Sequence, residues 1–116
     1  MDLTFTPEEE AFRKEARSWL AANVPGEPLP SLDTAEGFEK HREWESRLNA
    51  AGWALVPWAV DLGGRGDNLI EWLSFVEEYY RAGAPGRVNQ TGIFLLGPTI
   101  MEYGTEEQKA RYLPKM

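Results

Sequence analysis

Apolar residues recur at helical spacing near the start of the chain, directly after a helix start signal. Thr6 can cap a helix, Pro7 suits the first helical position, and Glu9 completes a capping box with Thr6. A helix over residues 6–24 gathers its apolar residues on one face, and these are Phe12, Ala16, Trp19 and Leu20. The next stretch, VPGEPLP, stops this helix and predicts a connecting loop.

A second apolar stripe predicts a helix from about residue 34 to residue 51. Asp33 or Thr34 can cap it, and Gly52 suits the left-handed position after its last turn. Its inward-facing residues are predicted to be Phe38, His41, Trp44, Leu48 and Ala51. The segment GWALVPWAVDLGGRGDN follows, and Pro57 rules out an ordinary central strand within it. We therefore expect an ordered loop that packs its tryptophans.

A third helix is expected over residues 69–82, with Asn68 as its N-cap. At about 100° per residue, one side forms a polar stripe of Glu71, Ser74, Glu78 and Arg81. The far side carries Leu69, Leu73, Val76 and Tyr80, with Trp72, Phe75 and Tyr79 beside them. This apolar arc is wider than one packing contact needs, so the helix is expected to be buried on two sides.

A fourth helical segment, over about residues 88–103, contains residues that disfavour a regular helix. Gly92 and Gly97 each lower the helix propensity by roughly 1 kcal/mol, and Pro98 lowers it by up to about 3 kcal/mol. Pro98 also lacks an N–H and crowds the preceding turn, so we expect a kink there. Small residues in this segment are expected to leave space beside it.

A last short helix is expected after Gly104, where Thr105 and Gln108 form a capping box and Pro114 ends the pattern. The sequence contains no internal repeat and no low-complexity segment. Because every periodic segment has helical rather than strand spacing, the predicted fold class is all-α, a helical bundle.

The composition excludes several classes of protein. The 116 residues, 42% of them hydrophobic, suit one domain with its own core, and the absence of Cys excludes disulfides and thiolate sites. The net charge of −7 disfavours nucleic acid and an acidic membrane surface as partners. The N-terminus is acidic, and the longest apolar stretch, IFLLGPTIM, is far shorter than the roughly 20 residues of a membrane span. A cytoplasmic protein without a membrane partner is expected.

Candidate chemical motifs have simpler structural explanations. GGRG at residues 63–66 lacks the strand and glycine spacing of a dinucleotide loop, so a tight bend with positive φ angles is favoured. His41, the only histidine, cannot build a His-based metal site and is expected to be packed and hydrogen-bonded. Most carboxylates fall on stripes expected to face solvent, namely Glu8, Glu9, Glu10, Glu39, Glu43, Glu78, Glu106 and Glu107. We predict no catalytic residue, no metal site and no cofactor-binding residue in this chain.

Two interpretations fit four residues of the fourth helical segment, which are Thr91, Phe94, Leu95 and Thr99. They can belong to an ordinary core, as most such residues do. Alternatively they form the wall of an apolar pocket, held open because the glycines and the proline of this segment reduce close packing.

The order of motifs along the chain resembles the N-terminal helical domain of the acyl-CoA dehydrogenases. The motifs are LTFTPEEEAFRKEARSWLAANVP, GW, GGRG, FVEEYYRAGAPG and GPTIMEYGTEEQKARYLPKM, and together they span essentially the whole chain. The last is the most specific, since its Gly-Pro, Tyr-Gly-Thr, Glu-Gln-Lys and Tyr-Leu-Pro groups match the family in order and spacing.

This resemblance implies that residues 1–116 are the first of three domains, without the central β-domain and the C-terminal helical bundle. The chain is then a truncated protein, a proteolytic fragment or the product of a split gene. In the family, a carboxylate from the C-terminal bundle removes the proton α to an acyl-CoA thioester while a hydride passes to FAD. The resemblance therefore implies that FAD is not bound by this chain alone, that the chain is inactive alone, and that the full-length protein is a homo- or hetero-oligomer.

The resemblance also assigns the pocket residues. The family's equivalent of residues 88–103 lines the acyl tail, so Thr91, Phe94, Leu95 and Thr99 become the candidate substrate-binding residues. Small residues in this segment would admit a bulky or branched tail. A flavin oxidase or monooxygenase of the same fold, and a self-standing helical interaction module, are the alternative functions.

Overall fold

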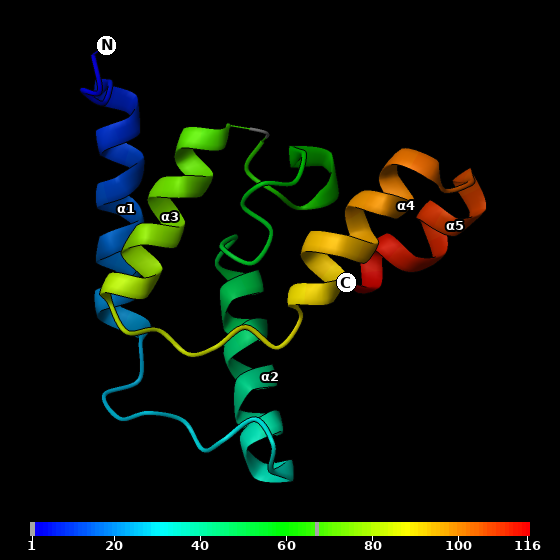
Figure 1. Cartoon of the computed structure of the whole chain (residues 1–116), viewed down its shortest axis with the longest axis horizontal. Helices are drawn as coiled ribbons and strands as arrows, with labels where there is room; N and C mark the ends of the chain where they lie inside the picture. Colours follow the sequence, from blue (N-terminus) through cyan, green and yellow to red (C-terminus); the bar gives the residue numbers. More distant parts are fainter. Residues whose placement is uncertain (1, 67) are drawn as a thin grey trace.

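The computed structural model of the chain describes residues 2–66 and 68–116, and within them it contains helices and no strand. The all-α fold class predicted from the sequence is therefore confirmed (Figure 1). The α-helices are α1 (Pro7–Asn23), α2 (Ala35–Ala50), α3 (Leu69–Arg81), α4 (Gly97–Tyr103) and α5 (Glu106–Tyr112). Two short helical turns, η1 (Val60–Leu62) and η2 (Gly92–Leu96), lie between these helices, and a third, η3 (Leu113–Lys115), follows α5.

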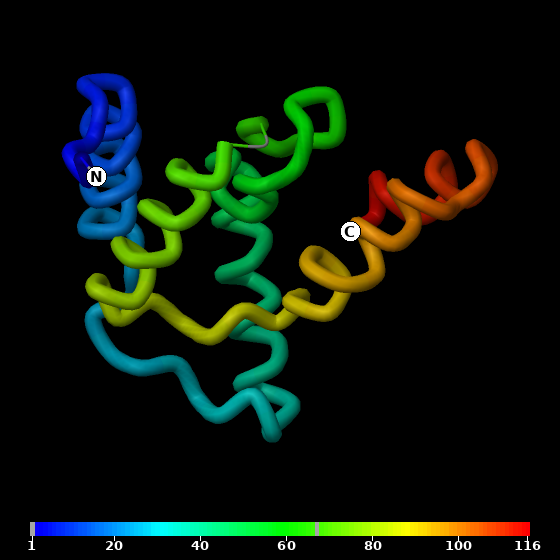
Figure 2. Tube along the Cα trace, turned by 45° about the horizontal axis from the view of Figure 1, so that its top comes forward, coloured from blue at the N-terminus to red at the C-terminus, as the bar shows by residue number. Residues whose placement is uncertain are grey.

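Figures 1 and 2 both show α1 and α3 lying side by side, with α4 and α5 projecting as a pair from the opposite side of the molecule. The long loop between α2 and α3 lies between these two parts (Figure 1). The C-terminus returns to the start of η2, where the side-chain amide of Asn89 donates to the carbonyl oxygen of Met116 over 2.9 Å.

The helix boundaries follow the local capping signals. The hydroxyl of Thr6 and the carboxylate of Glu9 form the predicted capping box of α1, and Thr105 forms the same motif for α5. Thr34 rather than Asp33 caps α2, by accepting a hydrogen bond from the N–H of Gly37. Each of these contacts spans three residues, which explains why the sequence alone located them.

The loop after α2 lies at the centre of the domain, and the prediction that it packs its tryptophans is confirmed. Its residues Trp53–Val56 and Trp58 are buried together with apolar residues of α1, α2 and α3. The ring of Trp53 stacks on Phe75 of α3, with centroids 5.3 Å apart and planes 4° apart. The guanidinium of Arg65 lies 3.4 Å from the centroid of the Trp53 ring. The tryptophans therefore join the loop to the helices around it.

The GGRG motif is the tight bend that closes this loop. Gly63 and Gly66 have φ angles of 91° and 110°, in the left-handed region that favours glycine. Gly64 is required by close approach instead, because a Cβ on it would lie 1.8 Å from the carbonyl oxygen of Trp58. The prediction of a structural bend is confirmed.

Two predictions about helix faces are wrong. Phe38, assigned to the inner stripe of α2, is 44% exposed, whereas His41 on the same stripe is buried as expected and donates from Nδ1 to the carbonyl oxygen of Gly37 over 2.7 Å. Glu78, assigned to a solvent-facing stripe, is only 2% exposed. The reason for the second error is that the polar stripe of α3 packs against α1 rather than facing water.

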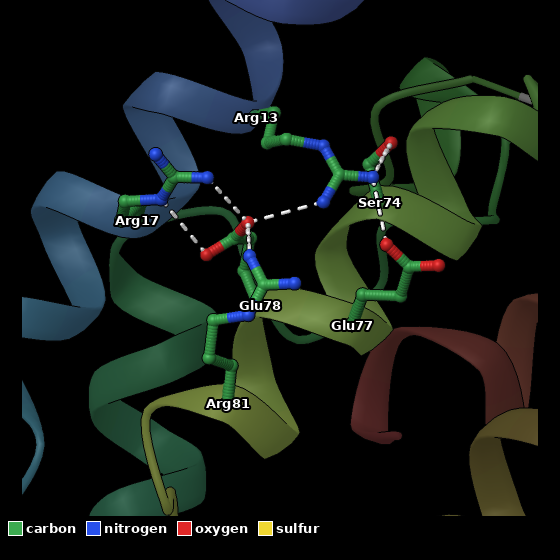
Figure 3. A network of polar contacts seen from close by, with 6 residues as sticks. All are labelled: Arg13, Arg17, Ser74, Glu77, Glu78 and Arg81. Atoms are coloured by element: carbon green, nitrogen blue, oxygen red, sulfur yellow. Dashed lines mark hydrogen bonds and ion pairs between the residues drawn. The ribbon is translucent and has the colours of Figure 1, made fainter.

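Glu78 is buried at the centre of a network of arginines (Figure 3). Its carboxylate accepts hydrogen bonds from Nη1 of Arg13 at 3.1 Å, from Nε and Nη2 of Arg17 at 3.0 and 2.8 Å, and from Nη1 of Arg81 at 3.1 Å. Arg13 also contacts Glu77 over 2.8 Å and the hydroxyl of Ser74 over 3.4 Å. The hydrogen bonds from Arg17, followed by the one from Arg13, hold the pKa of Glu78 below its ordinary value of 4.5 despite its burial.

The apolar far side of α3 is only partly covered. Leu69 and Tyr80 are each 72% exposed, and Leu73 is half exposed, whereas Phe75 and Tyr79 are buried in the core. Burial on two sides, as predicted from the width of the apolar arc, is therefore not reached within this chain.

Replacing Glu78 by Gln is expected to lower the free energy of unfolding by about 3 kcal/mol, the lower end for breaking a buried ion pair. Arg13 is buried and keeps only Glu77 as its ionic partner, whereas the side chains of Arg17 and Arg81 are largely exposed and can turn to water. Urea denaturation at neutral pH measures the loss. Glu43→Gln, which breaks an exposed 3.8 Å pair with Lys40, is the control and should cost less than about 1 kcal/mol.

The effect of Glu78→Gln on the free energy of unfolding should depend on pH. Because the folded-state pKa of Glu78 is lowered, its contribution is complete above its unfolded-state pKa and is lost as the pH falls through the folded-state value. The stability difference between the parent chain and Glu78→Gln should therefore shrink in acid below about pH 4.5. A difference that stays constant across this range contradicts the assignment.

Replacing Gly64 by Ala is expected to cost roughly 3 kcal/mol, because the new Cβ would overlap backbone atoms of Trp58 and Leu55 that cannot move independently. Gly26→Ala is the matched control, since nothing lies within 4 Å of a Cβ at that position. Thermal unfolding of both variants compares them. Equal melting temperatures for the two variants contradict the close approach at Gly64.

Candidate functional site

The segment that carries the predicted pocket residues is an irregular helix. The turn η2 leads directly into α4, and the N–H of Gly97 donates to the carbonyl of Gly92. A hydrogen bond that spans five residues defines a π-helical turn. The sequence predicted a kink at Pro98, and the structure has a π-helical turn over Gly92–Leu96, just before the proline, which the sequence did not predict.

The inner face of this segment packs on the tryptophan loop. Ile93 is 1% exposed, and the indole N–H of Trp58 donates to the carbonyl oxygen of Ile93 over 3.0 Å. Gly97 is buried against the same indole, because a Cβ on it would lie 2.4 Å from Cζ2 of Trp58. The space expected beside this glycine is therefore filled by an aromatic ring.

The outer face carries three of the four predicted pocket residues. Thr91, Leu95 and Thr99 are all exposed, Leu95 by 66%, and they follow one another at intervals of four residues. The hydroxyl of Thr99 donates to the carbonyl oxygen of Leu95, one helical turn earlier, over 2.7 Å, and this contact fixes the orientation of the Thr99 side chain. These three residues form a stripe, which we call the outer stripe.

Phe94 lies on a different side, toward α3. Its ring centroid is 5.1 Å from that of Trp72, and both rings border a groove of about 260 Å³. The groove is lined by Trp72, Phe75, Val76, Tyr79, Tyr80, Ala84, Pro85, Gly86, Arg87, Gln90 and Phe94. The structure therefore brings Phe94 to the edge of an aromatic groove, next to the outer stripe rather than within it.

The floor of this groove is held by Tyr79. Its hydroxyl accepts a hydrogen bond from the indole N–H of Trp44 at 2.8 Å and donates to the carbonyl of Pro85. Burial raises the pKa of Tyr79 to about 12, so its hydroxyl remains protonated near neutral pH and keeps donating.

A buried ion pair fixes the groove wall after α3. Arg87 donates from Nε to Glu45 over 2.9 Å and from Nη2 to the carbonyl of Ala54 over 2.9 Å. Both side chains of the pair are largely buried. This pair could not be predicted from the sequence, because Glu45 and Arg87 are 42 residues apart and neither continues an apolar pattern. A pair of this kind rigidifies the wall by a bidentate contact.

The GGRG bend does not offer donors to a phosphate. The N–H groups of Gly63 and Gly64 bond to the carbonyls of Val60 and Ala59, and those of Arg65 and Gly66 bond to the carbonyls of Val56 and Trp58. A phosphate-binding loop needs several N–H groups that point at the ligand. This bend therefore does not fit the pyrophosphate of a dinucleotide such as FAD.

The rest of the described chain adds little to the site. A larger cleft of about 650 Å³ lies between η1 and the α4–α5 pair and is lined by Asp61, Leu62, Met101, Glu106, Lys109, Ala110, Leu113 and Pro114, none of them a predicted pocket residue. Residues 2–66 and 68–116 contain no His, Cys, Asp and Glu cluster with the geometry of a metal site. Within the same ranges, no helix has the length and apolarity to cross a membrane.

Comparison with known proteins identifies the class to which this fold and this segment belong. The family model described as acyl-CoA dehydrogenase, N-terminal domain, matches residues 6–116. The chain therefore belongs to the acyl-CoA dehydrogenase family, as the order of its motifs predicted.

Named relatives and solved structures agree with this family. The chain is similar to acyl-CoA dehydrogenase IpdE1 of Mycolicibacterium smegmatis (46% identity over 94% of this chain) and to IpdE1 of Mycobacterium tuberculosis (43% over 92%). It spans 29% of the length of each of these relatives. Among solved structures, it is similar to the ChsE4-ChsE5 complex from Mycobacterium tuberculosis, with a TM-score of 0.79 and 35% identity over 99% of this chain and 28% of that one. It is also similar to a variant of the Tcur3481-Tcur3483 steroid acyl-CoA dehydrogenase, with a TM-score of 0.71 and 30% identity over 92% of this chain and 28% of that one.

Truncating a side chain on the inner face of the irregular helix should cost more stability than truncating one on its outer face. Ile93→Ala should lower the free energy of unfolding of this chain by about 2–5 kcal/mol, because it removes a buried aliphatic side chain. Leu95→Ala, two residues later, should cost less than about 1 kcal/mol because Leu95 is mostly exposed. Chemical denaturation compares the two, and equal losses contradict the assignment of the faces.

Proposed function

We propose that this chain is the N-terminal domain of a flavin-dependent acyl-CoA dehydrogenase and that it contributes one wall of the acyl-tail pocket. Family membership supports the reaction class, which is α,β-dehydrogenation of an acyl-CoA thioester. The observation that carries the role of this domain is the outer stripe, an exposed row with Leu95 at its centre, beside an aromatic groove. An exposed aliphatic side chain on a rigid helix gains free energy when a hydrocarbon covers it, by roughly 25 cal/mol for each Å² removed from water.

The polar groups of the outer stripe suit an apolar ligand. The hydroxyl of Thr99 already donates to the carbonyl of Leu95, so an acyl group on this face would meet its methyl group. Thr91 and Thr99 are then small residues on either side of Leu95, and Phe94 borders the adjacent groove. We assign Thr91, Phe94, Leu95 and Thr99 to binding of the acyl tail.

The groove favours a bulky, branched or ring-containing tail. Its volume of about 260 Å³ lies below the ordinary range for a whole small-molecule site, so it suits only the far end of a ligand. Its walls include Trp72, Tyr80 and Phe94, and aromatic walls pack well against flat ring systems. The similarity to a steroid acyl-CoA dehydrogenase agrees with a tail of this shape.

The remaining parts of the reaction are proposed to lie outside this chain. FAD supplies the hydride acceptor in this family, and the GGRG bend does not fit its pyrophosphate, so we assign no flavin contact to residues 1–116. The net charge of −7 likewise makes this domain a poor binding site for the phosphates of CoA. Its residues bind and orient the acyl tail and keep water from it, and the chain alone is proposed to be inactive.

The chain is proposed to act within a larger assembly. It spans only 29% of the length of the relatives IpdE1. The similar ChsE4-ChsE5 structure is a complex of two proteins, and the Tcur3481-Tcur3483 enzyme is likewise named for two. We propose that a β-domain and a C-terminal helical domain cover the exposed residues Leu69, Leu73 and Tyr80 of α3, and that the whole protein is a homo- or hetero-oligomer.

The decisive experiment uses the complete protein that carries this domain. The purified complete protein should show flavin absorbance, and that absorbance should be bleached anaerobically by a ring-containing acyl-CoA. Residues 1–116 alone should be colourless and should oxidise no acyl-CoA. A complete protein that binds no flavin, or whose flavin no acyl-CoA reduces, overturns the proposed reaction, and rapid oxygen consumption by the reduced flavin indicates an oxidase or monooxygenase instead.

The same protein tests the pocket wall. Leu95→Trp should lower kcat/KM for the ring-containing acyl-CoA at least about tenfold, which corresponds to about 1.4 kcal/mol, because the larger ring occupies space assigned to the tail. Glu43→Gln, an exposed change on α2, is the control and should leave kcat/KM unaltered. Equal kinetics for the parent protein and Leu95→Trp remove Leu95 from the pocket.

A further inference from the structure

The π-helical turn leaves one buried carbonyl without a donor from its own helix. The N–H of Gly97 bonds to the carbonyl of Gly92, five residues earlier. The next acceptor in the same register is the carbonyl of Ile93, whose donor would be the N–H of residue 98. Residue 98 is proline, which has no N–H. Because Ile93 is 1% exposed, its carbonyl needs a partner from elsewhere in the protein.

Trp58 supplies this missing donor. Its indole N–H lies 3.0 Å from the carbonyl oxygen of Ile93, and the ring is almost completely buried. An indole N–H is only a donor, so the contact satisfies both a buried donor and a buried acceptor. Trp58 therefore replaces, from 35 residues away, the hydrogen bond that Pro98 cannot make.

Gly97 makes the approach of the indole possible. A Cβ at this position would lie 2.4 Å from Cζ2 and 2.9 Å from Cη2 of Trp58, closer than such atoms come in proteins. Trp58, Gly97 and Pro98 therefore act together. Pro98 has no N–H for the carbonyl of Ile93, the indole of Trp58 donates to that carbonyl instead, and the missing side chain of Gly97 leaves room for the indole ring.

The GGRG bend fixes the indole in turn. The backbone N–H of Trp58 donates to the carbonyl of Leu55, and the N–H of Gly66 donates to the carbonyl of Trp58, each over 2.9 Å. Gly64 allows this carbonyl to approach the bend. The GGRG bend therefore supports the π-helical turn indirectly, because it holds the backbone of Trp58.

The register of this turn decides which side chains share the outer stripe. A π-helical turn acts as one extra residue within an α-helix, and one residue corresponds to a rotation of about 100°. If the turn relaxed to a regular α-helix, the segment before it, which contains Thr91, would rotate about the helix axis relative to the segment after it, which contains Thr99. The direction of the stripe thus depends on the contact that holds the turn.

We infer that Trp58 is a positioning residue for the acyl-tail pocket, which holds the π-helical turn Gly92–Leu96 through its indole N–H and so determines selectivity for bulky acyl groups. This inference rests on the proposed function. Within the described residues, Trp58 makes no hydrogen bond to the outer stripe and acts through the backbone of Ile93. Its effect is therefore on the shape of the pocket rather than on the reacting atoms.

The test compares Trp58→Phe with Glu78→Gln in the complete protein. Trp58→Phe keeps a ring and removes the buried indole hydrogen bond to Ile93, whereas Glu78→Gln disturbs the buried contacts between α1 and α3 and does not border the aromatic groove. Both variants should lose thermal stability. Only Trp58→Phe should lower the ratio of kcat/KM for a ring-containing acyl-CoA to that for a short straight-chain acyl-CoA, by roughly tenfold, or about 1.4 kcal/mol. The change should appear mainly in KM for the bulky substrate, with kcat for the short substrate unchanged. A ratio that is unaltered in Trp58→Phe, or equally altered in both variants, overturns the inference.

A second measurement does not require activity. Amide hydrogen exchange over residues 92–99 should be faster in Trp58→Phe than in Glu78→Gln, because only the first variant removes the support of the π-helical turn. Equal exchange overturns the inference even if the complete protein oxidises no acyl-CoA, so this result is separate from failure of the proposed function. In a Pro98→Ala background, an N–H at residue 98 can reach the carbonyl of Ile93, so Trp58→Phe should cost less stability there. Equal costs in both backgrounds also overturn it.

Discussion

The structure depends on burying a loop whose backbone has no regular partner. Residues 53–58 lie at the centre of the domain, and buried N–H and carbonyl groups must be hydrogen-bonded there. Arg65 donates from Nε to the carbonyl of Gly52 over 2.8 Å, Arg87 donates to the carbonyl of Ala54, and the GGRG bend returns its own N–H groups to the loop. Two arginines and a bend thus take the place that a β-sheet or a helix takes in other cores.

Around this loop, the helices use two different kinds of interface. α2 and α3 contribute apolar rings, of which Phe75 stacks directly on Trp53. α1 and α3 meet partly through charge, since Glu78 of α3 accepts hydrogen bonds from Arg13 and Arg17 of α1. Buried ion pairs contribute less to stability than apolar packing of the same volume, but they tolerate few alternative arrangements. The charged contact therefore aligns the helix pair, and the aromatic contacts supply most of the burial.

The irregular helix after α3 belongs to both the core and the candidate pocket. Its inner face binds Trp58 through Ile93 and Gly97, and its outer face presents Leu95 to the surroundings of the chain. Because a short π-helical turn is less favourable than an α-helix, it persists where tertiary contacts support it. The loop that fills the core thereby also orients the surface to which we assign the acyl tail. In this way the stability of the domain and the shape of the proposed pocket depend on the same residues.

The sequence by itself determined the features that act over a few residues. The capping boxes at Thr6 and Thr105 and the left-handed Gly52 were predicted correctly, because each depends on neighbours within one or two helical turns. The order of motifs also located the chain within its family.

Only the tertiary structure decided which faces meet. The burial of Glu78 depends on arginines of α1 that lie more than 60 residues away, so helical periodicity placed it wrongly in solvent. The pairing of Glu45 with Arg87, the turn of Phe94 toward Trp72 and the contact of Trp58 with Ile93 join residues 22 to 42 positions apart. Such contacts follow from how the helices pack, and a periodic pattern gives the direction of a side chain but not the partner that it reaches.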